Sequence, residues 1–354
     1  MYGHFWIACL TAAFLFFGPM LSCSGPVSVS GSNLEYASFL KLEEGRVISF
    51  SPYSGQSDTL CVSRPLGRIV CMSTSHVAFL DALGCDSVIC AVSGTGFISS
   101  APLQERIACG EVKDVGYDQA PDYETIVSLN PDVVLAYNVS AVPSPFASRL
   151  KSLGIRVFPL YEFLENHPLA RTEYVKAFGL MTGRQVAADS VFGAVRAAYD
   201  SLAGTVSRDA HRAKVLINIP YGDLWYIPGA DSYMARLVSD AGGEILGAQE
   251  GTSVSGVISL EEAFVLSGSA DFWLNTGLCR TRAELNAVNP AFSSFGVNRV
   301  YNNVRRCTAG GGNDFWESGC LRPDLILHDL ITIFKSSSDS TVSNQVLNYY
   351  IEVQ

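Results

Sequence analysis

Four polar residues in a row, Ser73, Thr74, Ser75 and His76, are of types that could carry out chemistry. A serine beside a histidine suggests a nucleophile with its general base. The surrounding segment, RIVCMSTSHVAFLDALG, is typical of a buried strand followed by a helix, so the hydroxyls fall where the helix begins. Hydroxyl groups there cap free backbone N–H groups, and the GxSxG spacing of a nucleophile elbow is absent from the segment. We therefore favour a helix cap, and keep as the alternative a cleft hydrolase or chelate-processing enzyme that uses Ser75, His76 or Glu317.

Histidines are too few and too scattered to hold a bare metal ion. The sequence contains His4, His76, His167, His211 and His328. A free Zn²⁺ or Mn²⁺ needs three or four donors converging in one place, and only His76 is well placed, with His167 as a second candidate. The sequence predicts no metal site and no cofactor, and a chelated or macrocyclic ligand fits better than a free ion.

The composition narrows the class of protein. Of the 354 residues 48% are hydrophobic and 16% are charged, and the formal net charge is −10. This apolar content argues against disorder. An acidic chain without basic runs is also a poor candidate for nucleic-acid binding, because phosphates require clustered Lys and Arg. The length allows two ordinary domains.

Residues 1–23 are similar to a lipoprotein signal peptide. The run from Phe5 to Cys23 carries no charge and is short for a membrane span. It ends in MLSC, like a bacterial lipobox, in which Cys23 is acylated and becomes the mature N-terminus. The preceding MYGH lacks Lys and Arg, and Met20 is unusual at its position. A buried or membrane-spanning helix is the alternative. Residues 24–66 are interpreted as a Ser/Gly-rich tether followed by extra strands.

Eight cysteines remain when Cys9 and Cys23 are set aside. Export would permit disulfides, and two pairs are candidates: Cys71 with Cys90, in neighbouring predicted strands, and Cys307 with Cys320, on either side of a glycine-rich loop. Buried, unpaired thiols are the alternative. None of the eight has the CxxC spacing of a zinc site.

Apolar runs rich in Val and Ile alternate with helical patterns along the rest of the chain. RIVCMS, SVICAVS, DVVLAY and RVFPL form one series; AKVLINI, GEIL, DFWLNT and RVYNN form a second. Such alternation indicates parallel sheets in an α/β fold, and a loose repeat of DYETIVSLNPDVVLAY as SLEEAFVLSGSADFWLN suggests two related lobes facing across a cleft. The sequence predicts two α/β lobes joined by one long rigid helix: lobes over 67–168 and 206–335, the linker helix over 169–205, and a tail, 336–354, without an assigned role.

These pieces together resemble a known family. From Arg68 to Phe334 the order of strand, Ser/Thr turn, ALG helix end, second strand, DVG, Glu-bearing helix and NPDVVLA is similar to the ABC-transporter substrate-binding proteins of the iron-siderophore, haem and cobalamin type. The later SLEEAF and RPDLILHDL segments fit the second lobe. The resemblance implies a non-enzymatic lipoprotein, exported to the periplasmic side of the cell envelope and anchored by Cys23, that hands an iron complex, haem or cobalamin to a permease dimer with its ATPase. A ligand scavenger without a transporter is a further alternative.

Ligands of α/β sheets bind at the carboxyl ends of strands, and aromatic and polar residues gather there in this sequence. Aromatic rings suit a large flat ligand and arginines suit carboxylates, although any single ring is equally suited to a core. The resemblance implies that the Ser/Thr turn faces the ligand as well. The predicted ligand-binding residues are Ser73, Thr74, Ser75, His76, Phe97, Tyr117, Tyr137, Tyr161, Tyr221, Trp225, Tyr226, Asn303, Arg305, Arg306, Phe315, Trp316 and Glu317.

The resemblance also implies two contacts with the permease. In the family an exposed acidic residue near a helix start on each lobe meets arginines of the permease dimer, and the matching residues here are Glu124 and Glu261. The alternative is that acids simply favour the first turn of a helix. Glu262 is expected to close a capping box with Ser259, which leaves Glu261 pointing outward.

Overall fold

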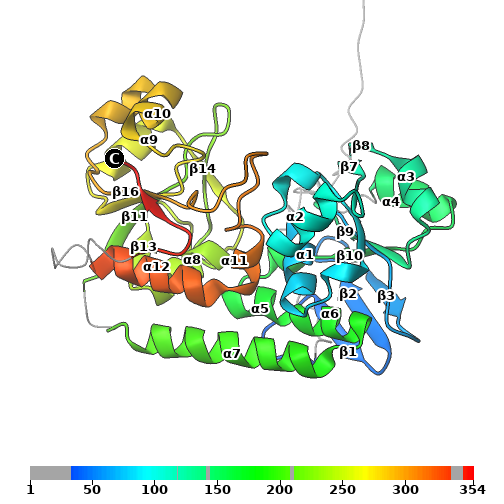
Figure 1. The fold of residues 1–354 in the computed structure, drawn as a ribbon. Helices are drawn as coiled ribbons and strands as arrows, with labels where there is room; N and C mark the ends of the chain where they lie inside the picture. The colour runs from blue at the N-terminus through cyan, green and yellow to red at the C-terminus, as the bar shows by residue number, and fades with distance from the viewer. Residues whose placement is uncertain (1–32, 118, 141–143, 208–210, 336–345) are drawn as a thin grey trace, which may run out of the picture.

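The chain forms two lobes that lie side by side (Figure 1). The structure, a computed structural model, describes residues 33–117, 119–140, 144–207, 211–335 and 346–354. The predicted signal segment and Cys23 lie outside these residues. Within them, no helix is both long and apolar enough to cross a membrane.

The N-terminal lobe is built on a five-stranded parallel sheet. Its strand order is β10-β9-β4-β5-β6. The inner strands are almost entirely Val, Ile, Leu and Ala because both faces of the sheet are covered. The elements of this lobe are β4 (Ile69–Cys71), α1 (Thr74–Ala82), η1 (Asp86–Val88), β5 (Ile89–Val92), η2 (Thr95–Phe97), α2 (Ala101–Ala108), β6 (Lys113–Asp114), β7 (Gly116–Tyr117), β8 (Ala120–Pro121), α3 (Tyr123–Leu129), β9 (Val133–Tyr137), α4 (Pro145–Ser152), β10 (Val157–Leu160) and η3 (Glu162–Leu164).

The segment with extra predicted strands forms a small antiparallel sheet of β1 (Leu40–Glu43), β2 (Arg46–Phe50) and β3 (Ser57–Cys61). Two buried carboxylates fasten the chain that leads into it. Glu173 accepts hydrogen bonds from the backbone N–H groups of residues 35–37, and Glu165 accepts them from residues 38 and 39. The sheet is therefore an integral part of this lobe.

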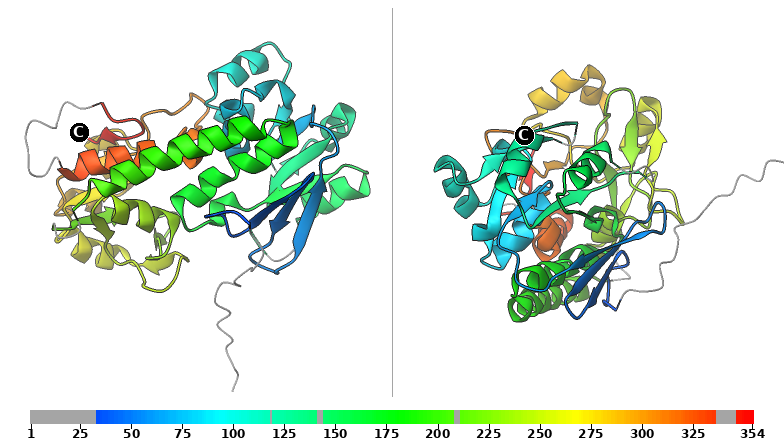
Figure 2. Two further views of the ribbon diagram at one scale, coloured as in Figure 1. Left: turned by 90° about the horizontal axis from the view of Figure 1, so that it is seen from below. Right: turned by 90° about the vertical axis from the view of Figure 1, so that its right-hand side faces the viewer.

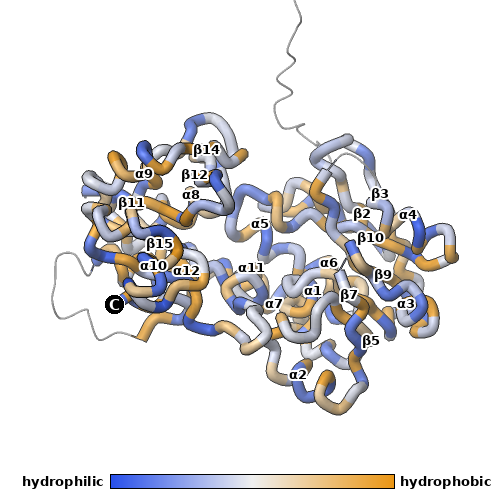
Figure 3. The backbone as a smooth tube through the Cα atoms, turned by 90° about the horizontal axis from the view of Figure 1, so that it is seen from above, coloured by the Kyte–Doolittle hydropathy of each residue, from blue (hydrophilic) through white to orange (hydrophobic). Residues whose placement is uncertain are grey.

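The predicted linker helix over 169–205 is wrong in its length. The stretch forms three helices, α5 (Pro168–Glu173), α6 (Val175–Thr182) and α7 (Gln185–Gly204). Gly183 ends α6 in the left-handed conformation at φ 70°, which glycine adopts without strain. Only α7 is long, and it runs along both lobes (Figure 2). Seen from above, α5 lies between the two lobes (Figure 3).

The C-terminal lobe contains a second five-stranded sheet, with order β13-β11-β15-β16-β17. All its pairings are parallel except that of β16 with β17. The elements are β11 (Ala213–Ile217), β12 (Trp225–Ile227), α8 (Tyr233–Asp240), β13 (Gly243–Ile245), β14 (Gly256–Ile258), α9 (Leu260–Ser267), β15 (Phe272–Leu274), α10 (Arg282–Val288), η4 (Pro290–Ser294), β16 (Val300–Asn302), α11 (Ser318–Leu321), α12 (Pro323–Lys335) and β17 (Ile351–Glu352).

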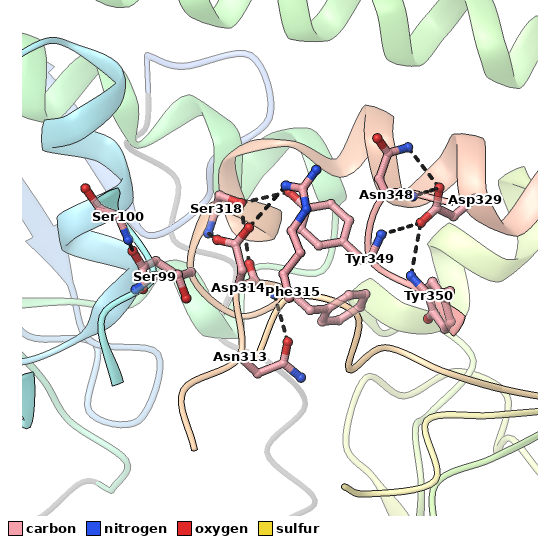
Figure 4. A network of polar contacts seen from close by, with 12 residues as sticks. Ser99, Ser100, Asn313, Asp314, Phe315, Ser318, Asp329, Asn348, Tyr349 and Tyr350 are labelled. Carbon is pink, nitrogen blue, oxygen red and sulfur yellow. Dashed lines mark hydrogen bonds and ion pairs between the residues drawn. The ribbon is translucent and has the colours of Figure 1, made fainter. Parts of the chain in front are cut away.

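The end of the chain, for which the sequence suggests no role, completes this lobe. Strand β17 pairs with β16, and the side chains of Tyr349 and Tyr350 are fully buried. The buried Asp329 carboxylate accepts hydrogen bonds from the backbone N–H groups of Asn348, Tyr349 and Tyr350 (Figure 4). The last residues therefore belong to the C-terminal core.

All eight cysteines among the described residues are free. Neither candidate disulfide, Cys71 with Cys90 or Cys307 with Cys320, is formed. Cys71, Cys90 and Cys320 are buried, and burial raises their pKa values, which keeps them as thiols. These cysteines therefore contribute to packing.

Candidate functional site

A cavity of about 410 Å³ opens between the two lobes, at the carboxyl ends of β4, β9 and β10. This volume lies within the range of about 300–1,000 Å³ that small-molecule sites occupy. The N-terminal lobe contributes a hydroxyl-rich turn, two aromatic rings and a carboxylate, and the chain after β16 contributes a tryptophan. The lining residues are Ser73, Thr74, Ser75, Tyr137, Val139, Glu162, Phe163, Arg171, Trp316 and Cys320.

The hydroxyls of the Ser73–Ser75 turn form a chain of hydrogen bonds instead of capping the helix. Ser73 occupies the N-cap position of α1, but its side chain accepts no backbone N–H. Its Oγ lies 2.7 Å from Ser75 Oγ, and Ser75 Oγ donates to Glu162 Oε1 at 2.6 Å. The prediction of a capping hydroxyl is therefore wrong, because the Ser73 hydroxyl bonds to Ser75 Oγ and not to a backbone N–H group of the helix.

His76 does not face the cavity. Its side chain is fully buried and packs against Phe178, with 5.9 Å between ring centroids. Its Nε2 lies 3.8 Å from Glu162 Oε1, and neither ring nitrogen has a hydrogen-bond partner. Burial lowers the pKa of His76, although the Glu162 carboxylate raises it, so the ring is neutral. We therefore withdraw His76 from the ligand-binding set. A serine–histidine nucleophile is also excluded in this arrangement, since the ring accepts no hydrogen bond from Ser75.

Five lining residues were not predicted as ligand-binding from the sequence: Val139, Glu162, Phe163, Arg171 and Cys320. Glu162 is 2% exposed, and its Oε2 atom has no hydrogen-bond partner. The terminal amino group of Arg171 donates to the Phe163 carbonyl, its guanidinium lies 3.9 Å from the centre of the Tyr233 ring, and its Nε is buried without a partner. The sequence signal was present for Glu162, which directly follows a predicted strand and its Tyr161.

The two aromatic residues of the NDFWESG segment have different environments. Trp316 is 52% exposed and lines the cavity, with its ring edge-on to Phe315 at 4.7 Å. Phe315 is 1% exposed and packs edge-on against Tyr349 and Tyr350. Trp316 therefore remains a ligand-binding candidate, while Phe315 is a core residue that supports it.

Glu317 fastens the two lobes together instead of facing a ligand. Its carboxylate, 2% exposed, accepts hydrogen bonds from the backbone N–H groups of Ser99 at 2.7 Å and Ser100 at 2.9 Å, at the start of α2. Burial raises the pKa of Glu317 to about 7, although these two hydrogen bonds act to lower it. The prediction that Glu317 contacts ligand is thus not supported by its placement.

Glu317 belongs to a segment, residues 306–317, that we call the strap. The strap turns back on itself, and its two arms pair through an antiparallel β-bridge between the backbones of Cys307 and Asn313. Thr308 Oγ1 donates to the Gly96 carbonyl at 2.7 Å, and Gly310 lies so close to the Gly96 backbone that a Cβ atom would collide with it. Figure 4 shows Ser99 and Ser100 of the first lobe beside Asp314 of the strap. The lobes are therefore joined by the strap as well as by α7.

The remaining predicted ligand-binding residues do not line the cavity. Trp225 is 1% exposed and packs in one aromatic cluster with Trp273 and Phe295, and its Nε1 donates to the Ile217 carbonyl. Its assignment to the site is therefore corrected to the core. Tyr161 and Asn303 are also buried. The others lie at the surface or between loops: Phe97 and Tyr117, whose rings are 5.9 Å apart, Tyr221, Tyr226, Arg305, and Arg306, which pairs with Asp314.

The two predicted docking residues occupy equivalent positions on the two lobes. Glu124 lies in the first turn of α3 and Glu261 in the first turn of α9, and both are exposed. Ser259 and Glu262 form the expected capping box, which leaves Glu261 outside it. Both helices lie on the side of the molecule opposite to α7 (Figure 1). Neither carboxylate forms an ion pair within the described part of the chain.

Known proteins share this architecture. The periplasmic haem-binding protein of Pseudomonas aeruginosa superposes with a TM-score of 0.59 at 18% identity, covering 82% of this chain and 98% of that one. The vitamin B12-binding protein of Vibrio cholerae gives a TM-score of 0.56 at 14% identity, covering 79% and 99%. An uncharacterized lipoprotein of Methanocaldococcus jannaschii is 27% identical over 281 residues, which are 77% of this chain and 66% of that protein.

The sequence profile of one family matches most of both lobes. The profile described as "Periplasmic binding protein" covers residues 69–287, from β4 through α10. Its members are extracytoplasmic binding proteins without catalytic activity. The chain therefore belongs to the periplasmic binding protein family.

Proposed function

We propose that this protein is a membrane-anchored lipoprotein that captures a metal complex between its lobes and delivers it to an ABC importer. The main support for this proposal is the lining of the cavity, in which the rings of Tyr137, Phe163 and Trp316 occur together with hydroxyl groups. Rings of this kind contact flat or apolar ligands over a large area. An iron-siderophore, haem and cobalamin are the candidate ligands.

A complexed metal suits this cavity better than a bare ion. Within the described ranges, no group of three or more His, Cys, Asp and Glu side chains is arranged to hold a metal. The cavity offers rings and hydrogen-bonding groups, which recognise the organic part of a complex. The metal would accordingly enter and leave with its own chelator.

Delivery would require little movement between the lobes. Helix α7 packs against both α6 and α12, and the strap adds a second connection. Two connections restrict hinge opening more strongly than one. We therefore propose modest closure around the ligand, with Glu124 and Glu261 presenting a nearly fixed pair of negative charges to the arginines of a permease dimer.

Equilibrium titration of the purified protein tests this function. Haemin, cyanocobalamin and ferrioxamine B serve as probes, followed by their own absorbance and by quenching of tryptophan fluorescence, to which Trp316 contributes. Saturable one-to-one binding of at least one probe is expected. Absorbance spectra and metal analysis of protein purified from its host identify the natural ligand. Failure of all three probes, with a metal-free and colourless native preparation, contradicts the proposed function.

A further inference from the structure

We propose that Glu162 and Arg171 together recognise a carboxamide group on the ligand, so that the cavity selects metal complexes whose periphery carries uncharged N–H donors over those that carry carboxylates. This inference rests on the proposed function and adds the chemistry by which the ligand is chosen.

The first step is the unfinished hydrogen bonding of Glu162. Oε1 accepts from Ser75, but Oε2 is buried and accepts from nothing. Buried carboxylate oxygens normally have partners, because an unpaired one loses its interactions with water without replacement. Since Glu162 lines the cavity, a ligand N–H group is well placed to supply the missing donor.

The second step is that no group of the described chain donates to Glu162 Oε2, although the cationic Arg171 lies in the same lining. His76 does not donate to the carboxylate either: its Nε2 is 3.8 Å from Oε1, and burial favours the neutral ring. Glu162 forms no ion pair with a Lys or Arg in the described chain. Cys320, also in the lining, is a buried thiol and supplies no positive charge. A ligand carboxylate could pair with Arg171, but it would leave Glu162 Oε2 without a donor and would bring a second carboxyl group beside it.

The third step concerns Arg171, the cationic residue of the lining. Its terminal amino group donates a hydrogen bond to the Phe163 carbonyl, and its guanidinium packs against the face of the Tyr233 ring. Its buried Nε–H lacks an acceptor. A carboxamide carries both an N–H donor and a C=O acceptor, so it would satisfy the free oxygen of Glu162 and the free N–H of Arg171 together. An ammonium group would satisfy only the first.

Matched ligands test the proposal on the unaltered protein. Haemin carries two propionates, and its diamide carries two carboxamides on the same ring; cyanocobalamin carries several carboxamides. Ferrioxamine B carries an ammonium group that acetylation converts to an amide. We expect the diamide to bind at least tenfold more tightly than haemin. If acetylation of ferrioxamine B abolishes its binding while the haem diamide and haemin bind alike, the donor is an ammonium group and the carboxamide assignment is overturned.

Glu162→Gln tests the residue directly, because it keeps the shape and removes the charge. Hydrogen bonds to charged groups are stronger than neutral ones, so affinity for the diamide and for cyanocobalamin should fall about five- to tenfold while affinity for haemin rises. Glu165→Gln is the matched control: Glu165 is equally buried but faces the backbone of residues 38 and 39, away from the cavity. Its affinities should be unchanged, and thermal unfolding checks that both variants are folded.

The failures of the two proposals are distinguishable. If haemin binds wild type as tightly as its diamide and Glu162→Gln changes neither, the cavity still binds a metal complex but the carboxamide inference is overturned. If none of the complexes binds wild type, both the proposed function and this inference are contradicted.

Discussion

Truncation of Trp225 and of Trp316 should have different consequences, although both residues lie in glycine-rich surroundings. Trp225 is 1% exposed, stacks on Trp273 at 5.9 Å and on Phe295 at 6.0 Å, and donates to the Ile217 carbonyl. Trp225→Ala removes these contacts and leaves a cavity and an unpaired carbonyl, so the free energy of unfolding should fall by about 3–5 kcal/mol.

Trp316→Ala should leave stability nearly intact, because the ring is 52% exposed. Surface substitutions usually change the free energy of unfolding by less than about 0.5 kcal/mol. Loss of the ring should instead weaken ligand binding by roughly 1–2 kcal/mol, or about five- to thirtyfold in Kd.

Urea unfolding followed by circular dichroism measures the first quantity, and titration with the tightest-binding probe measures the second. The phenylalanine variants at both positions are controls that keep an aromatic ring. A stable Trp225→Ala protein with weakened binding would return Trp225 to the site and refute the placement of the core. A strongly destabilised Trp316→Ala protein with normal affinity would refute the cavity assignment.

Three further predictions concern the strap, the docking surface and the membrane anchor. Burial raises the pKa of Glu317 from 4.5 to about 7, so between these pH values the folded state holds a proton that the unfolded state has lost. The contribution of Glu317 to the free energy of unfolding should be complete below about pH 4.5 and should be lost as the pH rises through 7. This contribution amounts to up to about 3 kcal/mol. Urea unfolding at pH 5 and pH 8 should show a smaller loss of unfolding free energy for Glu317→Gln than for wild type. Part of the loss should persist in the variant because burial also raises the pKa of Glu165 to about 7. Glu124→Lys combined with Glu261→Lys should leave ligand affinity unchanged but reduce uptake in a salt-dependent way, and normal uptake at normal protein level would contradict docking. Cys23→Ser should release the protein from the membrane fraction. A wild-type protein that is already soluble and unacylated would contradict the lipid anchor.

Much of the architecture could be predicted because it depends on local patterns. Runs such as DVVLAY specify buried parallel strands, and the order of strands and helices specifies two lobes. The predicted linker helix is too long because the apolar periodicity continues across Gly183, although a glycine after a helical run is itself a stop signal. Periodicity alone does not show that the chain turns there and that α6 packs against α7.

The site was less predictable, since exposure decides which residues can bind. The glycines around DLWY suggested loops, yet Trp225 lies in a short strand that covers the C-terminal core. The sequence predicts Tyr161 and not its neighbour Glu162 as a site residue, but the structure buries Tyr161, and Glu162 lines the cavity. Glu317 was recognised as chemically notable, but its partners lie more than 200 residues earlier in the chain.

The insertion of Tyr349 and Tyr350 into the C-terminal core also determines when that core can form. Asp329 has no backbone N–H groups of residues 348–350 to accept from until those residues have left the ribosome. The second sheet likewise lacks β17 until then. The nascent C-terminal lobe therefore stays incomplete until β17 has been synthesised, 50 residues after its partner strand β16.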